Sequence, residues 1–166
     1  MADPIRIISY TPHLREAFVA LNRVWIERYF GMEKEDEREL NDVEGVIIAP
    51  GGDVLFALPE GAPLVPESVL GCIGIYVRDP GIYEIIKLAV RDDVQGKGLG
   101  KRLMQAAMDR IGEMGAQKAI ILSNSSLSPA MQLYKVMGFR EAELGYKHLF
   151  ERADIEFEYL YPAKEA

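Results

Sequence analysis

The segment VRDDVQGKGLGKRLMQAAMDRIGEMG, residues 90–115, joins a strand to a helix through a turn rich in glycine. Glycine lets a ligand approach the backbone closely, and the first turn of a helix offers unpaired N–H groups with the positive end of the helix dipole. Such a turn predicts a binding site for an anion, and for phosphate in particular. The glycines are Gly96, Gly98 and Gly100, and the basic residues beside them are Lys97, Lys101 and Arg102.

Two common phosphate-binding motifs do not fit this segment. The dinucleotide fingerprint G-x-G-x-x-G requires its third glycine one residue after Gly100, and the next predicted strand ends in LSN, without the acidic residue that binds ribose. The nucleotide P-loop G-x-x-x-x-G-K-[ST] requires glycine where Gln95 stands and serine or threonine where Arg102 stands. The spacing therefore favours neither a dinucleotide-dependent oxidoreductase nor a protein that binds nucleoside triphosphates.

The segments around this turn predict a mixed sheet covered by helices. Apolar runs and alternating patterns indicate strands, and apolar residues near period 3.6 indicate helices. Strands are expected over residues 4–10, 54–58, 69–77, 82–90, 117–123, 138–144 and 153–161, and helices over 13–30, 33–40, 99–115 and 130–137. Because antiparallel-looking strands precede a β-α-β unit, we expect an α/β (α+β) fold with a mixed, mostly antiparallel sheet of about seven strands and about four helices. One domain over residues 1–166 is expected.

Composition narrows the class of protein. The chain has 166 residues and a net charge of −7, which argues against nucleic acids and anionic membranes as partners. Its apolar runs are too short to span a bilayer, and its first ten residues lack the pattern of a signal peptide. Cys72 is the only cysteine, so an internal disulfide is impossible, and no Cys/His cluster predicts a metal site. We expect a cytoplasmic protein in which Cys72 is buried and inert.

Three segments together resemble the GCN5-related N-acetyltransferase (GNAT) superfamily. Gln95, Gly98 and Gly100 match its Q/R-x-x-G-x-G/A loop in order and spacing. The segment YEIIKLAV (83–90) looks like its fourth strand, and PAMQLYKVMGFRE (129–141) looks like its A-x-x-L-Y-x-x-x-G-F segment. The resemblance covers roughly residues 82–141. It implies that the phosphate held by the glycine loop is the pyrophosphate of coenzyme A and that acetyl-CoA is the cosubstrate.

The resemblance also implies catalytic roles for three residues. Glu84 stands where several members carry a general base, acting directly or through water, although the base varies within the superfamily. Tyr134 matches the tyrosine that often protonates the coenzyme A thiolate. In the family a bulge separates the fourth and fifth strands, so that main-chain groups of Leu88 and Val90 bind the acetyl carbonyl and the pantetheine arm. Leu88 N–H is the candidate donor to the oxyanion.

A longer set of residues is expected to contact the cofactor by the same resemblance. Asn124 is a special case, because the family often has its asparagine three residues before the motif alanine, where this chain has Leu127. Asn124 either reaches the cofactor or turns the chain, and the sequence leaves both open. The expected set is Leu88, Val90, Gln95, Gly96, Lys97, Gly98, Leu99, Gly100, Lys101, Asn124 and Tyr134.

Residues outside the motifs are candidates for binding the acceptor amine. Tyr29 and Phe30, at the end of the first predicted helix, are expected to be exposed, and Trp25 is expected to pack in the core with the apolar stripe of that helix. The acidic run over residues 33–40 is expected to be a solvated helix face, although it could attract a polycation. Arg152 could instead select an acceptor amine that carries a carboxylate group. The candidate acceptor-binding residues are Tyr29, Phe30, Tyr146 and Arg152.

The sequence thus predicts an enzyme that transfers an acetyl group from acetyl-CoA to a primary amine by direct attack, with no covalent enzyme intermediate. The acceptor is expected to be a small molecule or a peptide, and a homodimer is possible. A non-catalytic acetyl-CoA-binding module, a sensor or an interaction domain, is the alternative, since it would keep the glycine loop without an acid and a base.

Overall fold

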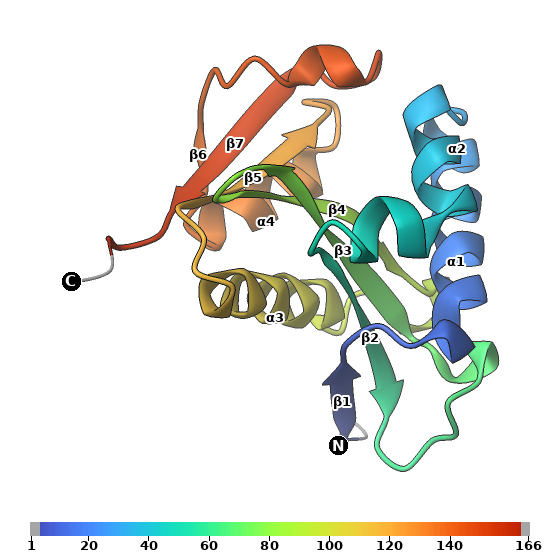
Figure 1. Ribbon diagram of the computed structural model, residues 1–166. Coiled ribbons are helices and arrows are strands. Elements are labelled where there is room, and N and C mark those ends of the chain that lie inside the picture. Colours follow the sequence, from blue (N-terminus) through green and yellow to red (C-terminus); the bar gives the residue numbers. More distant parts are fainter. Residues whose placement is uncertain (1–3, 164–166) are drawn as a thin grey trace.

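A computed structural model describes residues 4–163, in which seven strands and four α-helices follow the predicted order (Figure 1). Residues 1–3 and 164–166, the ends of the predicted domain, lie outside the described residues. The strands are β1 Ile5–Ile8, β2 Asp53–Pro59, β3 Gly71–Asp79, β4 Ile82–Val90, β5 Lys118–Ser123, β6 Arg140–Glu141 and β7 Ile155–Leu160. The helices are α1 Arg15–Tyr29, α2 Lys34–Asn41, α3 Leu99–Glu113 and α4 Ser128–Val136.

The strands form one mixed sheet in the order β1-β2-β3-β4-β5-β7-β6. The pair β4 and β5 is parallel, because α3 carries the chain back between them, and the other neighbouring pairs are antiparallel. The expected mixed, mostly antiparallel sheet of seven strands with four helices is therefore confirmed. Among the helices of residues 4–163, none is long and apolar enough to cross a membrane.

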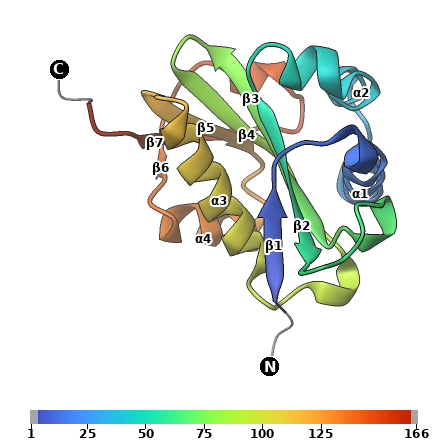
Figure 2. The same cartoon turned by 60° about the horizontal axis from the view of Figure 1, so that its bottom comes forward.

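The helices cover both faces of the sheet, with α1 and α2 on one face and α3 and α4 on the other (Figure 2). Two apolar clusters result. The first lies between the sheet and α3, whose buried residues recur with helical spacing. The second lies between the sheet and α1, and includes Phe18, Phe56 and Ile47. The buried residues of α3 are Leu99, Leu103, Met104, Ala107, Met108 and Ile111.

Two segments differ from the sequence-based expectation. Residues Glu44–Ile48 form a helical turn of π type that had no predicted structure, and Ile47 from this turn is completely buried. The strand expected over residues 138–144 is only Arg140–Glu141. Beyond it, the chain leaves the sheet because the carboxylate of Glu156 on β7 binds the backbone of the following loop.

A bulge in β4 opens the sheet. Lys87 has φ of 56°, a left-handed conformation that non-glycine residues seldom adopt. The register with β3 shifts there, because Cys72 pairs with Ala89 whereas Gly74 pairs with Ile86. β4 pairs with β5 only over Ile82–Glu84, so the two strands separate from this point toward their C-terminal ends. The separation creates the opening that holds the candidate site.

Candidate active site

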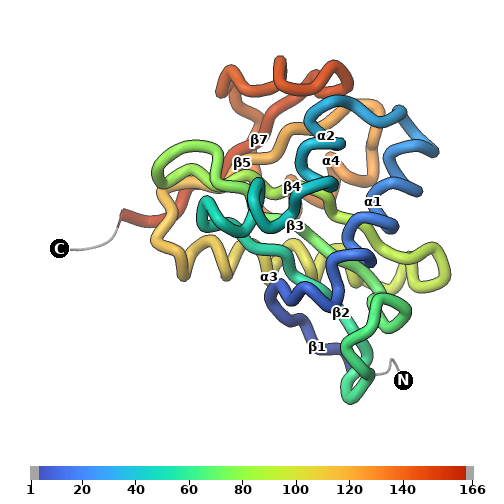
Figure 3. Tube along the Cα trace, turned by 45° about the vertical axis from the view of Figure 1, so that its right-hand side comes forward, coloured from blue at the N-terminus to red at the C-terminus, as the bar shows by residue number. Residues whose placement is uncertain are grey.

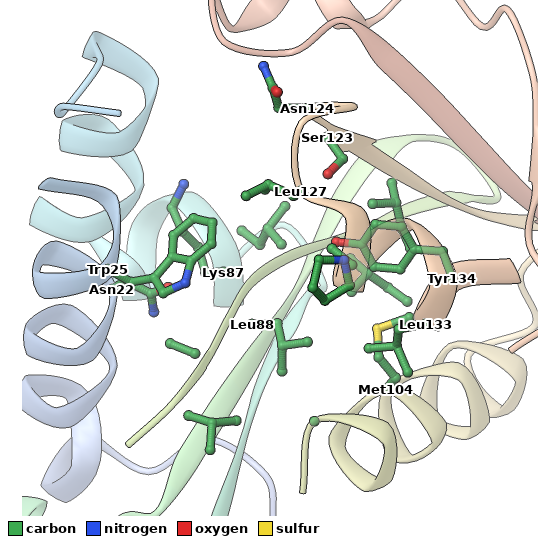
Figure 4. Close-up of a pocket in the computed structure, with 18 of the residues that line it drawn as sticks. Asn22, Trp25, Lys87, Leu88, Met104, Ser123, Asn124, Leu127, Leu133 and Tyr134 are labelled. Atoms are coloured by element: carbon green, nitrogen blue, oxygen red, sulfur yellow. The ribbon is translucent and has the colours of Figure 1, made fainter. Parts of the chain in front are cut away.

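The site is a cavity of about 420 Å³ at the separation of β4 and β5 (Figure 4). Its walls come from α1, β4, the glycine loop, α3, the end of β5, the start of α4, and the segment before β7. Of the residues predicted for the site, the cavity brings together Phe30, Glu84, Leu88, Val90, Gln95, Gly96, Gly98, Leu99, Gly100, Asn124, Tyr134 and Arg152. Lys97, Lys101, Tyr29 and Tyr146 do not line it.

The glycine loop leaves room for a ligand against its backbone. Gly96 and Gly98 both have φ of 80°, and Gly98 is the N-cap of α3. A Cβ atom added to Gly96, Gly98 or Gly100 would meet no other atom within 4 Å. The first turn of α3 carries no acidic side chain, so its N–H groups and the helix dipole face the opening without a competing charge.

Side chains around the loop fix its shape. The Gln95 amide donates hydrogen bonds of 3.2 Å to the Val90 carbonyl and to Asp92 Oδ1. Asp92 in turn pairs with Arg28 of α1 at 2.9 Å, which ties the loop to the opposite side of the opening. Gln95 thus shapes the loop with its side chain. Lys97 and Lys101 are exposed and make no ion pair within residues 4–163.

Glu84 of β4 lines the cavity with only 2% of its surface exposed. The Arg78 guanidinium donates hydrogen bonds to Glu84 Oε1 from Nε at 2.9 Å and from Nη2 at 2.5 Å. Burial raises the pKa of Glu84 to about 7, and Arg78 limits the rise by stabilising the carboxylate. A buried carboxyl group with a pKa near neutrality has the property that a general base needs.

Tyr134 lies in α4, on the opposite wall from Trp25, and Leu88 lies between these two walls (Figure 4). Pro129 in the first turn helps to fix the start of this short helix, and the ring of Tyr134 packs edge-on against Phe157 with centroids 5.5 Å apart. Burial raises the pKa of Tyr134, and the Ser123 hydroxyl partly opposes this effect. The phenol is therefore protonated at neutral pH, as a proton donor must be.

The bulge turns neighbouring side chains of β4 to different faces. Ile86 packs in the α1 cluster, Lys87 reaches α2 on the same face, and Leu88 packs toward α3. Two successive residues therefore share one face, which is the effect of a bulge on a strand. The backbone of Lys87 and Leu88 is thereby displaced from the regular ladder at the cavity wall.

Asn124 fixes the turn after β5. Its Nδ2 donates to the Arg152 carbonyl at 2.7 Å, and its Oδ1 accepts a bond of 2.9 Å from the Ser126 backbone N–H. The sequence left open whether Asn124 turns the chain or contacts the cofactor, and these hydrogen bonds show that it stabilises the turn. Asn124 also lines the cavity, so a contact with the cofactor stays a prediction.

The acidic helix α2 is not simply a solvated face, and that expectation is wrong. Asp36 and Glu39 are 0% and 1% exposed. Asp36 binds Lys87 Nζ at 2.5 Å and both terminal nitrogens of Arg152 at 2.6 Å, and Glu39 lies 3.3 Å from the same Lys87. Burial acts to raise the pKa of Asp36, but Arg152 and Lys87 outweigh it and lower the pKa to about 2. Helix α2 therefore holds the cationic side chains of Lys87 and Arg152 in place at the cavity wall.

These contacts join parts of the chain that are far apart in sequence. Figure 3 shows the connection between β6 and β7 beside the start of α2. Glu33 accepts backbone hydrogen bonds from Glu151 and Arg152, at 2.7 and 3.3 Å. The carboxylate of Glu156 binds backbone N–H groups at the other end of the same connection, including that of Tyr146 at 2.6 Å. The connection is thus fixed at both ends.

Replacing Asp36 with alanine tests this network. The variant removes a carboxylate that pairs with both Lys87 and Arg152, and these buried cations would keep fewer negative partners. We therefore expect the free energy of unfolding to fall by about 3 kcal/mol. Urea denaturation measures the change. Glu37→Ala is the matched control on the same helix, because its pair with Arg23 is half exposed and should contribute less than about 1 kcal/mol. Equal effects of the two variants would contradict a structural role for Asp36.

Two predicted acceptor residues lie outside the cavity. Tyr29 is 54% exposed, as expected, and its ring contacts Trp25 with centroids 5.3 Å apart. The Tyr146 hydroxyl bonds to Asp79 at the turn between β3 and β4. Neither side chain reaches the cavity wall.

The sequence-based interpretation missed residues on the α1 side of the cavity. Trp25 was expected in the core, but it is half-buried and lines the cavity, while Asn22 and Ile26 belong to the buried face of α1. Trp25 and Ile26 are neighbours in the sequence but lie on adjacent faces of α1. The apolar pattern alone therefore did not show which of the two packs in the core. Lys87 and Phe150 also line the cavity, and no sequence signal pointed to them.

Comparison with known proteins agrees with this geometry. The model of the acetyltransferase (GNAT) family matches residues 17–139. An uncharacterized N-acetyltransferase of Schizosaccharomyces pombe is 30% identical over 96 residues, which are 55% of this chain and 59% of that protein. A mycothiol acetyltransferase of Corynebacterium aurimucosum is 34% identical over 64 residues, 39% of this chain and 21% of that protein. The chain therefore spans between about a fifth and three fifths of these curated relatives.

Solved structures show the same fold. A GNAT acetyltransferase of Staphylococcus aureus superposes with a TM-score of 0.78 at 18% identity, covering 93% of this chain and 98% of that one. The PaiA N-acetyltransferase of Thermoplasma acidophilum, solved in complex with coenzyme A, gives a TM-score of 0.67 at 16% identity, covering 95% and 99%. With a family match over most of its length and this fold, the chain belongs to the GNAT acetyltransferase family.

Proposed function

We propose that this protein transfers an acetyl group from acetyl-CoA to a primary amine. The observation that carries the proposal is a single cavity lined by the glycine loop, by Glu84 of β4 and by Tyr134 of α4. Membership of the GNAT family and the coenzyme A complex of the Thermoplasma relative support acetyl-CoA as cosubstrate. The amine would be a small molecule or a peptide.

The residues of the glycine loop fit the cofactor. A pyrophosphate would fit in the open space beside Gly96, Gly98 and Gly100, at the N-terminus of α3. The exposed side chains of Lys97 and Lys101 add positive charge beside this space. The pantetheine arm would follow the backbone of Leu88 and Val90 where β4 and β5 separate. Acetyl-CoA supplies an activated acyl group when it is bound, and the protein supplies position and proton transfer.

Three groups of the protein act on the reaction. Glu84 accepts the proton that the ammonium must lose, directly or through water, and the nitrogen then forms a bond to the acetyl carbon. Leu88 N–H donates a hydrogen bond to the carbonyl oxygen while negative charge grows on it. Tyr134 gives its proton to the sulfur as the carbon–sulfur bond breaks. The second proton that the nitrogen loses on becoming an amide passes through water to the Tyr134 phenolate, and Glu84 releases its proton to solvent. The products are an amide and the free thiol of coenzyme A.

Replacing Tyr134 with phenylalanine separates catalysis from binding. The variant keeps the ring that packs on Phe157 but removes the proton, so we expect kcat to fall by roughly ten- to a thousand-fold. Thiol release measures the rate, and calorimetry should give an unchanged Kd for acetyl-CoA. Unchanged turnover would contradict the role of Tyr134 as the acid. A protein that binds acetyl-CoA and acetylates no amine would be the sensor or interaction module considered above.

We also infer one catalytic domain that works in the cytoplasm, as a monomer or a homodimer, without nucleic-acid or membrane partners. The net charge of −7 supports the absence of polyanionic partners. Cys72 is fully buried, and burial raises the pKa of its thiol to about 12, which supports an inert cysteine and not a nucleophile that carries the acetyl group.

A further inference from the structure

The half of the cavity away from the glycine loop faces α1 and the segment before β7. We define it as the acceptor half, lined by Asn22, Trp25, Phe30, Glu84, Lys87, Phe150 and Arg152. Figure 4 shows Trp25 and Asn22 projecting from α1 on the side opposite Tyr134. The acceptor half combines aromatic side chains with a small number of charges, and these charges restrict the class of amine.

The cations of the acceptor half already have partners. Arg152 holds Asp36 through two bonds of 2.6 Å and Glu33 at 3.2 Å, and Lys87 holds Asp36 and Glu39. Both side chains are largely buried, with 18% and 5% exposed. A carboxylate on the acceptor would have to displace a buried pair, at the cost of an unpaired charge. Carboxylate-bearing amines are therefore disfavoured.

The acceptor half is equally poor in free negative charge. Glu84 is the one carboxylate in the cavity walls built by residues 4–163, because Asp36, Glu39 and Glu33 lie behind Lys87 and Arg152. The proposed reaction uses Glu84 for the amino group that is acetylated. A second ammonium of a diamine or polyamine would enter the cavity without a partner.

The acceptor half contains three aromatic residues, Trp25, Phe30 and Phe150. The ring of Trp25 lies 5.9 Å from that of Phe30, and the Arg152 guanidinium lies 4.8 Å from the ring of Phe150 and 5.8 Å from that of Phe30. The two phenylalanines are thus partly covered by Arg152. Trp25 remains as the large aromatic wall, suited to stacking on an apolar ring.

We propose that the acceptor is a primary amine on an aromatic or other apolar body, with a single positive charge and no carboxylate, and that Trp25 selects it. This inference rests on the proposed function. The ammonium loses one proton to Glu84, and its nitrogen forms the amide bond as the carbon–sulfur bond of the thioester breaks. Tyr134 protonates the departing thiolate and is reprotonated by the second proton that the nitrogen loses, so acetyl-CoA is the only other reactant.

Three matched amines test the charge argument on the full-length protein. They are 2-phenylethylamine, phenylalanine, which adds a carboxylate to the same body, and 1,4-diaminobutane, which replaces the ring with a second amine. Acetyl-CoA is the donor, and thiol release gives kcat and KM. We expect kcat/KM for 2-phenylethylamine to exceed that for each of the others by at least about ten-fold.

Variants of Trp25 test the selecting residue. Trp25→Ala should raise KM for 2-phenylethylamine by about ten-fold with an unchanged Kd for acetyl-CoA, and Trp25→Phe should restore most of the affinity. Val24→Ala, at an exposed position on the same helix, is the control and should behave like the wild type. Trp25 is also the only tryptophan of the chain, so its fluorescence should change when 2-phenylethylamine binds.

The outcomes separate this inference from the proposed function. If acetyl-CoA binds but phenylalanine or 1,4-diaminobutane is the better acceptor, or if Trp25→Ala leaves KM unchanged, the acceptor class is wrong and acetyl transfer stands. If the folded protein, checked by circular dichroism, does not bind acetyl-CoA, both are overturned.

Discussion

Gly98→Glu is expected to abolish acetyl-CoA binding, with a rise in Kd of at least about a hundred-fold. The added side chain would project into the open space at the start of α3, where the pyrophosphate is placed, and its negative charge would repel the phosphates. The positive φ of Gly98 adds backbone strain. Isothermal titration calorimetry measures the change.

Gly61→Glu is the matched control for this variant. Gly61 has φ of 78°, a Cβ atom there would also meet nothing within 4 Å, and the residue does not line the cavity. The two variants thus share the backbone strain and the added charge. We expect Gly61→Glu to bind acetyl-CoA as the wild type does. Retained binding by a folded Gly98→Glu variant would mean that the phosphates lie elsewhere.

Glu84→Gln is expected to reduce kcat/KM by roughly a hundred- to ten-thousand-fold, because glutamine cannot accept the proton of the amine. The wild type should show a pH profile with a rising limb. Burial raises the pKa of Glu84 to about 7, above that of an ordinary glutamate, so the carboxylate forms and activity rises as the pH increases through this value. Activity should therefore be lower at pH values below this pKa, and this pH dependence should disappear in Glu84→Gln.

Glu39→Gln controls for the loss of any buried carboxylate near the site. Glu39 does not line the cavity, but its negative charge contributes to the raised pKa of Glu84. The variant should keep its turnover, with the rising limb shifted toward lower pH. An unchanged limb in Glu84→Gln would assign the titration to another group and contradict Glu84 as the base.

The sequence predicted the order of elements, and it predicted most of the residues that line the cavity beside the glycine loop, because both depend on local patterns. Gly96 and Gly98, both with positive φ, precede the start of α3, and the alternation of apolar residues indicated the strands. Tyr134 was named because it belongs to a contiguous motif of the GNAT superfamily, and it lines the cavity, while its role as the acid stays a prediction.

The acceptor half was harder to predict because it depends on contacts between distant segments. Asp36 is buried by Lys87 and Arg152, which lie 51 and 116 residues further along the chain, so the acidic run alone gave no sign of burial. The bulge at Lys87 contains no glycine, so the residues themselves did not indicate it, and it was expected only from the resemblance to the GNAT superfamily. Trp25 was misplaced because a shift of one residue on α1 moves a side chain from the core to the cavity.

Calorimetric titration of the purified, cofactor-free protein with acetyl-CoA, with NADH as the control ligand, tests the central claim most directly. The account predicts saturable binding of acetyl-CoA and none of NADH, since the loop has the spacing of a coenzyme A site and not that of a dinucleotide site. A folded protein that does not bind acetyl-CoA, or that prefers NADH, would contradict the assignment of the glycine loop and the proposed acetyl transfer with it.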